Sequence, residues 1–149
     1  MNQLDLEVNK LGFSLNRLEG FTLIELLICL VIVAILAGIA YPSYQNFVIM
    51  SRRADAQSEL IKAQLEQSSY RILHPVYIST ATSVGLPSNN QHYTFSIVSA
   101  AAHSYLMKAV ANVNSSQKND NTACKTLFVD QNSVKTSNGN EDNAFCWHQ

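Results

Sequence analysis

The residue with the most unusual surroundings in this sequence is Glu25. It lies near the start of the apolar run Phe21–Ala40, which contains no Lys, Arg, Asp, Asn or Gln. A carboxylate is costly in a segment of this kind, and acids that persist there usually have a function. Glu25 is therefore the first candidate for a functional group.

Cys124 and Cys146 are the second candidate pair. If the C-terminal part of the chain is exported, they are a plausible disulfide, and in a cytosolic protein they would be two ordinary thiols. Neither belongs to a Cys-x-x-Cys, and His148 is too close to Cys146 for the usual zinc-ligand spacing. A disulfide is therefore favoured over a metal site. Cys29 lies within the apolar run and is expected to act as a packing residue.

No pattern in the sequence predicts an enzyme or a cofactor. The chain has no Gly-rich phosphate loop. Its histidines have no acid or nucleophile at a recognisable catalytic spacing. They are His74, His92, His103 and His148.

Charge does not predict a particular bulk partner. The net charge is −1, from 10 basic and 11 acidic residues, so neither nucleic acid nor an anionic surface is favoured. The segments 119–121 and 141–143 could offer oxygen ligands to Ca²⁺, but polar surface loops explain them better. Contact with nucleic acid is possible but not indicated, because a solvated helix face explains the candidate cations better. These cations are Arg52, Arg53, Lys62 and Arg71.

The apolar run predicts the element that positions Glu25. About 20 apolar residues can cross a bilayer as one helix. Residues 1–20 lack the basic start and small-residue cleavage site of a secretory signal, so we expect an anchor that stays in the mature chain. Flanking charge does not decide the orientation. We favour a cytoplasmic N-terminus, because a processed leader and a disulfide-bearing head both require it.

The helix is expected to continue beyond the membrane segment, from Phe21 to about Leu73. Pro42 predicts a kink or a local break. Apolar residues then recur at helical spacing and predict the face that packs on the rest of the chain. His74-Pro75 ends the pattern. The predicted packing face of the helix comprises Phe47, Met50, Ala54, Ile61, Leu65 and Ile72.

After a polar connection over 75–91, the pattern changes to alternation, which is typical of strands. Strands are expected over 93–97, 103–112, 125–130 and around 134–136, joined by polar loops. The predicted fold class is α+β: a long N-terminal helix packed on a small antiparallel sheet.

The stretch G-FTLIELLICLVIVAILAGIAYPSYQ, from Gly20 to Gln45, closely resembles the N-terminus of type IV pilins. The segments SRRADAQSEL, HYTFSI, YLMKAVA and ACKTLFVDQ…FCW resemble more weakly the PilE kind of minor pilin. The leader, residues 1–20, is longer and more acidic than is usual in the family, which leaves the true start codon open.

The resemblance implies roles for individual residues. Gly20 would end the leader and be cut by a prepilin peptidase, and Phe21 would become the N-methylated first residue. Glu25 would pair with the Phe21 amine of a neighbouring subunit during assembly. Gly38 and Pro42 would let the helix loosen in the filament, although membrane helices also simply tolerate these residues. The family also pairs cysteines at the positions of Cys124 and Cys146.

The expected function is a minor subunit of a type IV pilus. The domains would be a leader over 1–20, a membrane and filament-core helix over 21–40, and an exported head over 41–149. The protein would lie in the bacterial inner membrane before joining the pilus, with other pilins and the assembly machinery as partners. Motility, adhesion and DNA uptake are the associated activities. The alternatives are a major pilin, a pseudopilin of type II secretion, and a plain single-pass anchor carrying a binding domain.

Overall fold

The computed structural model describes residues 20–138 and 144–147. The expected leader therefore lies outside the described residues, except for Gly20. The chain divides into two units, Met1–Ile39 and Ala40–Gln149.

One helix, α1, runs over Leu23–Leu73 and contributes to both units. Its predicted extent is thus confirmed to within two residues. Glu25 lies in the first turn and Arg71 in the last, where each charge interacts favourably with the helix dipole. Of the kink or local break predicted at Pro42, the break does not occur, because α1 continues through this residue, and the kink stays a prediction.

In the first unit, the described residues form an exposed apolar helix. Every residue from Gly20 to Ile39 is exposed. By length and composition the helix can cross a membrane. Its Leu, Ile and Val side chains need lipid or another protein to cover them.

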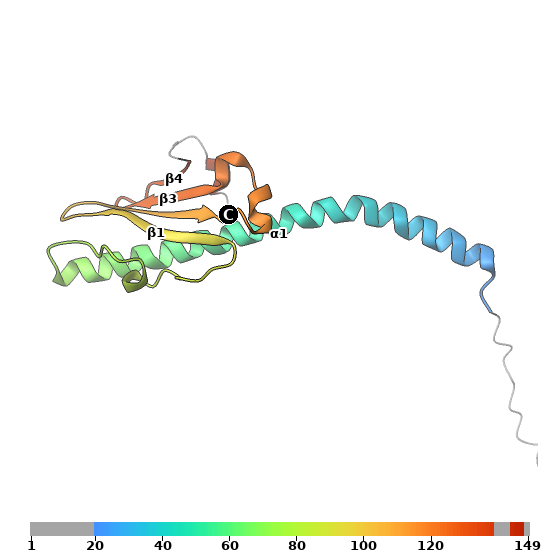
Figure 1. Cartoon of the computed structure of the whole chain (residues 1–149), viewed down its shortest axis with the longest axis horizontal. Helices are drawn as coiled ribbons and strands as arrows, with labels where there is room; N and C mark the ends of the chain where they lie inside the picture. The colour runs from blue at the N-terminus through green and yellow to red at the C-terminus, as the bar shows by residue number, and fades with distance from the viewer. Residues whose placement is uncertain (1–19, 139–143, 148–149) are drawn as a thin grey trace, which may run out of the picture. The chain divides into compact units, whose positions relative to one another are not determined.

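In the second unit, four strands form an antiparallel sheet in the order β1-β2-β3-β4 (Figure 1). All four predicted strands are confirmed, and only their ends differ. A register shift between Ile97 and Ser99 interrupts the pairing of β1 with β2. The strands are β1 Tyr93–Ala100, β2 Tyr105–Ala111, β3 Thr126–Asp130 and β4 Lys135–Ser137.

One face of this sheet packs against the second part of α1 (Figure 1). Burial alternates along β2 and β3, as the sequence pattern predicts. Leu60 is the largest apolar side chain that the helix buries in this core. The sheet contributes Tyr93, Phe95, Tyr105, Met107, Ala109, Leu127 and Val129.

The predicted packing face of the helix is wrong. Phe47 is 69% exposed, Leu65 66% and Ile72 81%. The side that faces the sheet instead carries Ile49, Arg53, Ala56, Gln57, Leu60, Ala63 and Gln67. Ala56 and Ala63 let the sheet approach closely, and the polar side chains find partners inside the head, which removes the penalty for burying them.

The predicted disulfide between Cys124 and Cys146 is present. It joins two short 3₁₀ turns, η5 over Thr122–Cys124 and η6 over Ala144–Cys146. Gln57 Nε2 donates to the carbonyl of Cys146 at 2.6 Å, which ties the C-terminal turn to α1. Two further turns lie in the loops, η3 over Thr82–Val84 and η4 over Ser116–Asn119.

Candidate functional site

Glu25 is held by Thr22 at the start of α1. The Thr22 backbone N–H and hydroxyl donate to Glu25 Oε2 at 3.1 and 3.0 Å, and the Glu25 N–H donates to Thr22 Oγ1 at 3.3 Å. This reciprocal arrangement is a capping box, which satisfies backbone donors that a helix start leaves unpaired. The carboxylate therefore has a partner within its own chain, whereas its pairing with the Phe21 amine of a neighbouring subunit stays a prediction.

The other predicted residues of the N-terminal segment do not gather around Glu25. Gly20 and Phe21 precede α1, and Phe21 is 81% exposed. A Cβ added at Gly38 would meet no atom within 4 Å. The roles of Gly20 and Phe21 in processing, and of Gly38 and Pro42 in helix flexibility, remain predictions.

A buried ion pair joins α1 to the loop that contains η4. Arg53 Nη1 lies 3.2 Å from Asp120 Oδ1, and the two side chains are only 11% and 4% exposed. The prediction that Arg53 lies on the solvated helix face is therefore wrong. Asp120 Oδ1 also accepts from the Asn121 N–H at 2.7 Å. Asp120 is therefore buried in an ion pair and does not belong to a polar surface loop as predicted for 119–121. The other segment considered for Ca²⁺, residues 141–143, lies outside the described part of the chain.

Gln117 lies at the centre of the same buried network. Its Nε2 lies within hydrogen-bond distance of the Ile49 carbonyl, the Tyr93 hydroxyl and Asp120 Oδ2, at 3.1, 2.9 and 3.1 Å. Burial, and then the charge of Asp120, raises the pKa of Tyr93 well above its ordinary value, so the phenol stays protonated. The network fixes the 115–120 loop against α1. Sequence reasoning missed this network because a buried Gln has no periodic signature. One signal was available: Arg53 follows Ile49 by four residues and precedes Ala56 by three, which places all three on one face of the helix.

The other candidate cations on α1 bind within the head. Arg52 Nη1 donates to Ser116 Oγ. Lys62 pairs with Glu59 at 2.7 Å on the surface. Arg71 Nη1 donates to the His74 carbonyl at 2.7 Å and its guanidinium lies over the Tyr77 ring. Each of these three cations thus has a partner within the chain.

The described histidines are not brought together. His74 stacks on Tyr70 after the end of α1, His92 precedes β1, and His103 lies between β1 and β2. Burial, and then the charge of Arg52, lowers the pKa of His92. His148 lies outside the described residues. Over residues 20–138 and 144–147, no cluster of His, Cys, Asp or Glu has the arrangement of a metal site.

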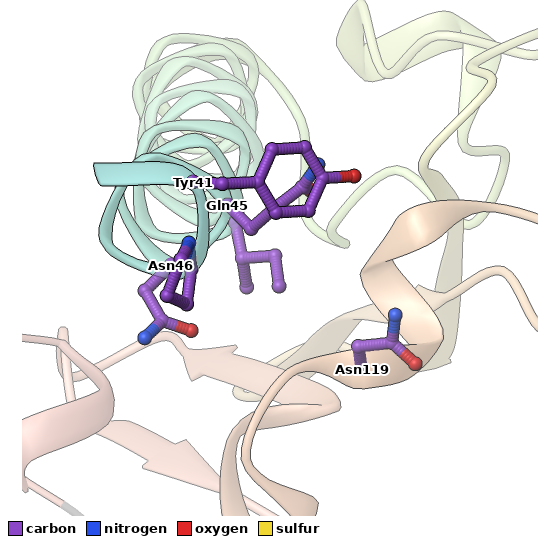
Figure 2. Close-up of a pocket in the computed structure, with 6 residues that line it drawn as sticks. Tyr41, Gln45, Asn46 and Asn119 are labelled. Carbon is purple, nitrogen blue, oxygen red and sulfur yellow. The ribbon is translucent and has the colours of Figure 1, made fainter. Parts of the chain in front are cut away.

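A pocket of about 520 Å³ lies between α1 and the 115–120 loop. In Figure 2, Tyr41, Gln45 and Asn46 belong to the helix and Asn119 faces them from the loop. Pro42 and Ile49 complete the lining. Its amides can donate to and accept from a ligand or a polypeptide, and the lining holds no charged side chain.

Two family models match the sequence. Residues 42–128 match a model described as the type IV minor pilin ComP, a DNA uptake sequence receptor. Residues 16–41 match the prokaryotic N-terminal methylation motif. The two matches meet at the same place in α1, and together they cover most of the chain.

Several curated proteins are similar to this chain. The type IV wide pilus major component PilA4 of Thermus thermophilus is 39% identical over 103 residues, which are 64% of this chain and 75% of that protein. The major pilin PilA of Myxococcus xanthus is 34% identical, over 57% of this chain and 39% of its own length. The major pilin PilE of Neisseria gonorrhoeae is 36% identical, over 51% of this chain and 46% of its own length. The alignments thus span less than half of the last two proteins.

The fold also occurs among solved structures. A type IV pilin from Shewanella oneidensis superposes with a TM-score of 0.51, over 68% of this chain and 99% of that chain. Sequence identity is 22%, so this likeness concerns the fold alone.

Proposed function

This chain belongs to the type IV pilin family, and from that premise we propose that it is a minor pilus subunit that takes part in DNA uptake. The observation that carries the proposal is the match of the head, residues 42–128, to the minor pilin ComP. The subunit would be inserted in the inner membrane by its N-terminal helix, cut after Gly20, methylated at Phe21 and then assembled with other pilins.

The exposed sides of the helix support an assembly role. Apart from Thr22 and Glu25, residues 21–39 expose a mostly apolar surface, and within the second unit Tyr41, Tyr44 and Phe47 are also large exposed side chains. Contiguous apolar surface of this extent is typical of a surface that another protein or lipid covers. Lipid can cover it before assembly and neighbouring helices can cover it afterwards. The membrane anchor would then also be the part that packs inside the filament.

The mature N-terminus and the abundance of the chain in pili test this proposal together. We expect mass spectrometry of sheared pili to find a chain that begins at N-methylated Phe21 and is present at a small fraction of the most abundant pilin. If the chain is as abundant as the main subunit, it is a major pilin instead. The curated relatives named above are major pilins. Detection of an uncut chain that stays in the membrane would contradict the assembly role and favour a plain anchor.

A pseudopilin of type II secretion is the remaining alternative. It would undergo the same cleavage and methylation, so the N-terminus does not distinguish it from a pilus subunit. Deletion of this chain should change piliation or DNA uptake and leave the export of secreted enzymes intact. Loss of enzyme export with normal pili would contradict the proposal.

The DNA-uptake part of the proposal requires cations that can reach phosphate. Arg53 is buried in an ion pair and Lys62 pairs with Glu59, whereas Lys108, Lys118 and Lys125 belong to neither pair. All three lysines lie within the segment that matches the DNA uptake sequence receptor. Lys118 is exposed on η4, and Lys108 is half-buried on the outer side of β2.

We expect Lys118→Glu to weaken binding of the full chain to duplex DNA. A lysine that contacts one phosphate contributes about one unit to the slope of log K against log salt, so the variant should lower that slope by about 1. Electrophoretic mobility shifts at several salt concentrations measure the slope. Lys62→Glu is the matched control, since this lysine already pairs with Glu59. Equal effects of the two variants would indicate bulk charge and not a defined contact.

A further inference from the structure

A second pocket, of about 430 Å³, lies between the end of α1 and the segment that follows it. Its volume falls within the range of about 300–1,000 Å³ that is usual for small-molecule sites. We call it the hydroxyl pocket, because five of the seven residues that line it carry a hydroxyl group. These five are Tyr70, Tyr77, Ser79, Thr80 and Ser83, and the other two are Val76 and Ile78.

We propose that the hydroxyl pocket binds an uncharged pyranose sugar. Ser79, Thr80 and Ser83 are exposed at the pocket, and each hydroxyl can donate one hydrogen bond and accept others. A sugar hydroxyl has the same dual character. The residues that line the pocket carry no charge, and the nearby Arg71 guanidinium already lies over the Tyr77 ring and donates to the His74 carbonyl. This disfavours a phosphate, a carboxylate or a metal cation as the ligand.

Two aromatic rings supply the apolar part of the site. Tyr70 and Tyr77 both contribute surface to the pocket. Each ring is held by a neighbour: His74 stacks on Tyr70 at 3.7 Å between centroids, and Tyr105 meets Tyr77 edge-on at 4.8 Å. The negative face of an aromatic ring attracts the slightly positive C–H groups of a pyranose. Rings beside hydroxyl groups match both surfaces of a sugar.

The Tyr105 phenol, which contacts the Tyr77 ring, stays protonated at neutral pH. Burial, followed by the neighbouring Tyr77 and Asp130, raises the pKa of Tyr105 to about 12, so the phenol beside Tyr77 carries no negative charge. A neutral phenol does not repel the oxygen atoms of a sugar.

The backbone beside the pocket is preorganised. Gln67 Nε2 donates to the Ile78 carbonyl at 2.7 Å and the Ile78 N–H donates to Gln67 Oε1 at 2.8 Å, so this buried side chain pairs with Ile78 like a neighbouring strand. The Tyr77 N–H donates to the Ala101 carbonyl, and the Ser83 N–H donates to the Thr80 carbonyl. A site whose walls are already fixed loses less entropy when it binds a ligand.

The pocket near Tyr41 is the alternative site for a sugar, because its side chains also carry amides that can form hydrogen bonds. Its side chains Gln45, Asn46 and Asn119 could also bond to sugar hydroxyls. The hydroxyl pocket is favoured because its aromatic rings and its backbone are both held by contacts within the head. The hydroxyl pocket could bind a sugar whether or not the chain is a minor subunit and whether or not it binds DNA.

Saturation-transfer NMR with four methyl glycosides tests the proposal on the full chain. The sugars are glucose, galactose, mannose and N-acetylglucosamine, and the detergent must have no sugar headgroup. We expect transfer to the ring C–H protons of at least one sugar. The triple variant Ser79→Ala, Thr80→Val and Ser83→Ala should weaken its affinity about tenfold or more, since two or three hydrogen bonds are lost.

Two matched variants locate the site. Thr82→Val removes a hydroxyl from the same exposed turn outside the pocket lining, and Asn46→Ala removes an amide from the competing pocket. Both should bind the sugar as the unaltered chain does, and circular dichroism should show the same fold for all variants. Binding of the same sugar coupled to agarose would indicate the end of a surface glycan, and binding only in solution would indicate a free sugar. The proposal fails if none of the four sugars shows transfer, if the triple variant binds normally, or if Asn46→Ala removes binding.

Discussion

Replacing Glu25 with alanine is expected to reduce incorporation of this chain into pili by about tenfold or more. In a filament of packed helices, the carboxylate can neutralise the amine of a neighbouring Phe21 away from water. Without the acid, that amine would be buried with no opposite charge. The amine exists only after cleavage, so the pairing would couple processing to assembly. The amount of variant in sheared pili, relative to the amount in the membrane, measures the effect.

Thr22 makes it possible to separate the charge of Glu25 from its role at the helix start. Glu25→Gln removes the charge but keeps an oxygen that can accept from Thr22, whereas Thr22→Val removes the hydroxyl and keeps the charge. If the ion pair drives assembly, Glu25→Gln should be excluded from pili and Thr22→Val should enter them. Normal incorporation of Glu25→Gln would contradict the pairing, and exclusion of Thr22→Val alone would indicate that the cap is what matters.

Replacing Asp120 with alanine is expected to destabilise the head by about 3–5 kcal/mol. The change would leave the Arg53 guanidinium buried without an opposite charge, in a place where it is shielded from water. It would also remove the acceptor of the Asn121 N–H. Since small domains have a free energy of unfolding of about 5–15 kcal/mol, this is a large fraction of the total. Denaturant unfolding followed by the fluorescence of Trp147, the one tryptophan in the sequence, measures it.

A surface ion pair on the same helix provides the control. Lys62 and Glu59 lie 2.7 Å apart with side chains 65% and 26% exposed. Glu59→Ala should therefore cost less than about 1 kcal/mol. The double variant Arg53→Met with Asp120→Ala should be more stable than Asp120→Ala alone, because it no longer buries an unpaired charge. If Asp120→Ala and Glu59→Ala lower the free energy of unfolding equally, the buried pair does not stabilise the head.

Local patterns sufficed for the elements of the fold. The alternation of Tyr105, Met107 and Ala109 identified β2, of which the structure buries this side, and the length of the apolar run identified the first half of α1. Both patterns reflect the geometry of a single element. In a strand every second side chain lies on the same face, and in a helix every third or fourth side chain does. The disulfide could also be anticipated, since Cys124 and Cys146 stand outside the apolar run and lack metal-ligand spacing.

The buried face of α1 could not be found in this way. An apolar stripe through Phe47, Leu65 and Ile72 is the obvious choice by hydrophobicity, yet these side chains are exposed in the chain by itself. For a subunit that packs against other helices, apolar residues are needed on the outside as well as in the core. Periodicity therefore reports that a face is apolar and not which partner covers it.

The sequence alone determined the long helix, the four strands, the unusual acid Glu25 and the resemblance to type IV pilins, because each depends on neighbouring residues. Only the tertiary structure decided that Arg53 and Gln67 face the core and that the hydroxyl pocket forms beside Tyr70. Arg53 and its partner Asp120 are 67 residues apart, and Gln67 pairs with a backbone segment beyond the end of its own helix. Whether a polar side chain can be buried depends on the partner that folding brings to it, and no local pattern contains that partner.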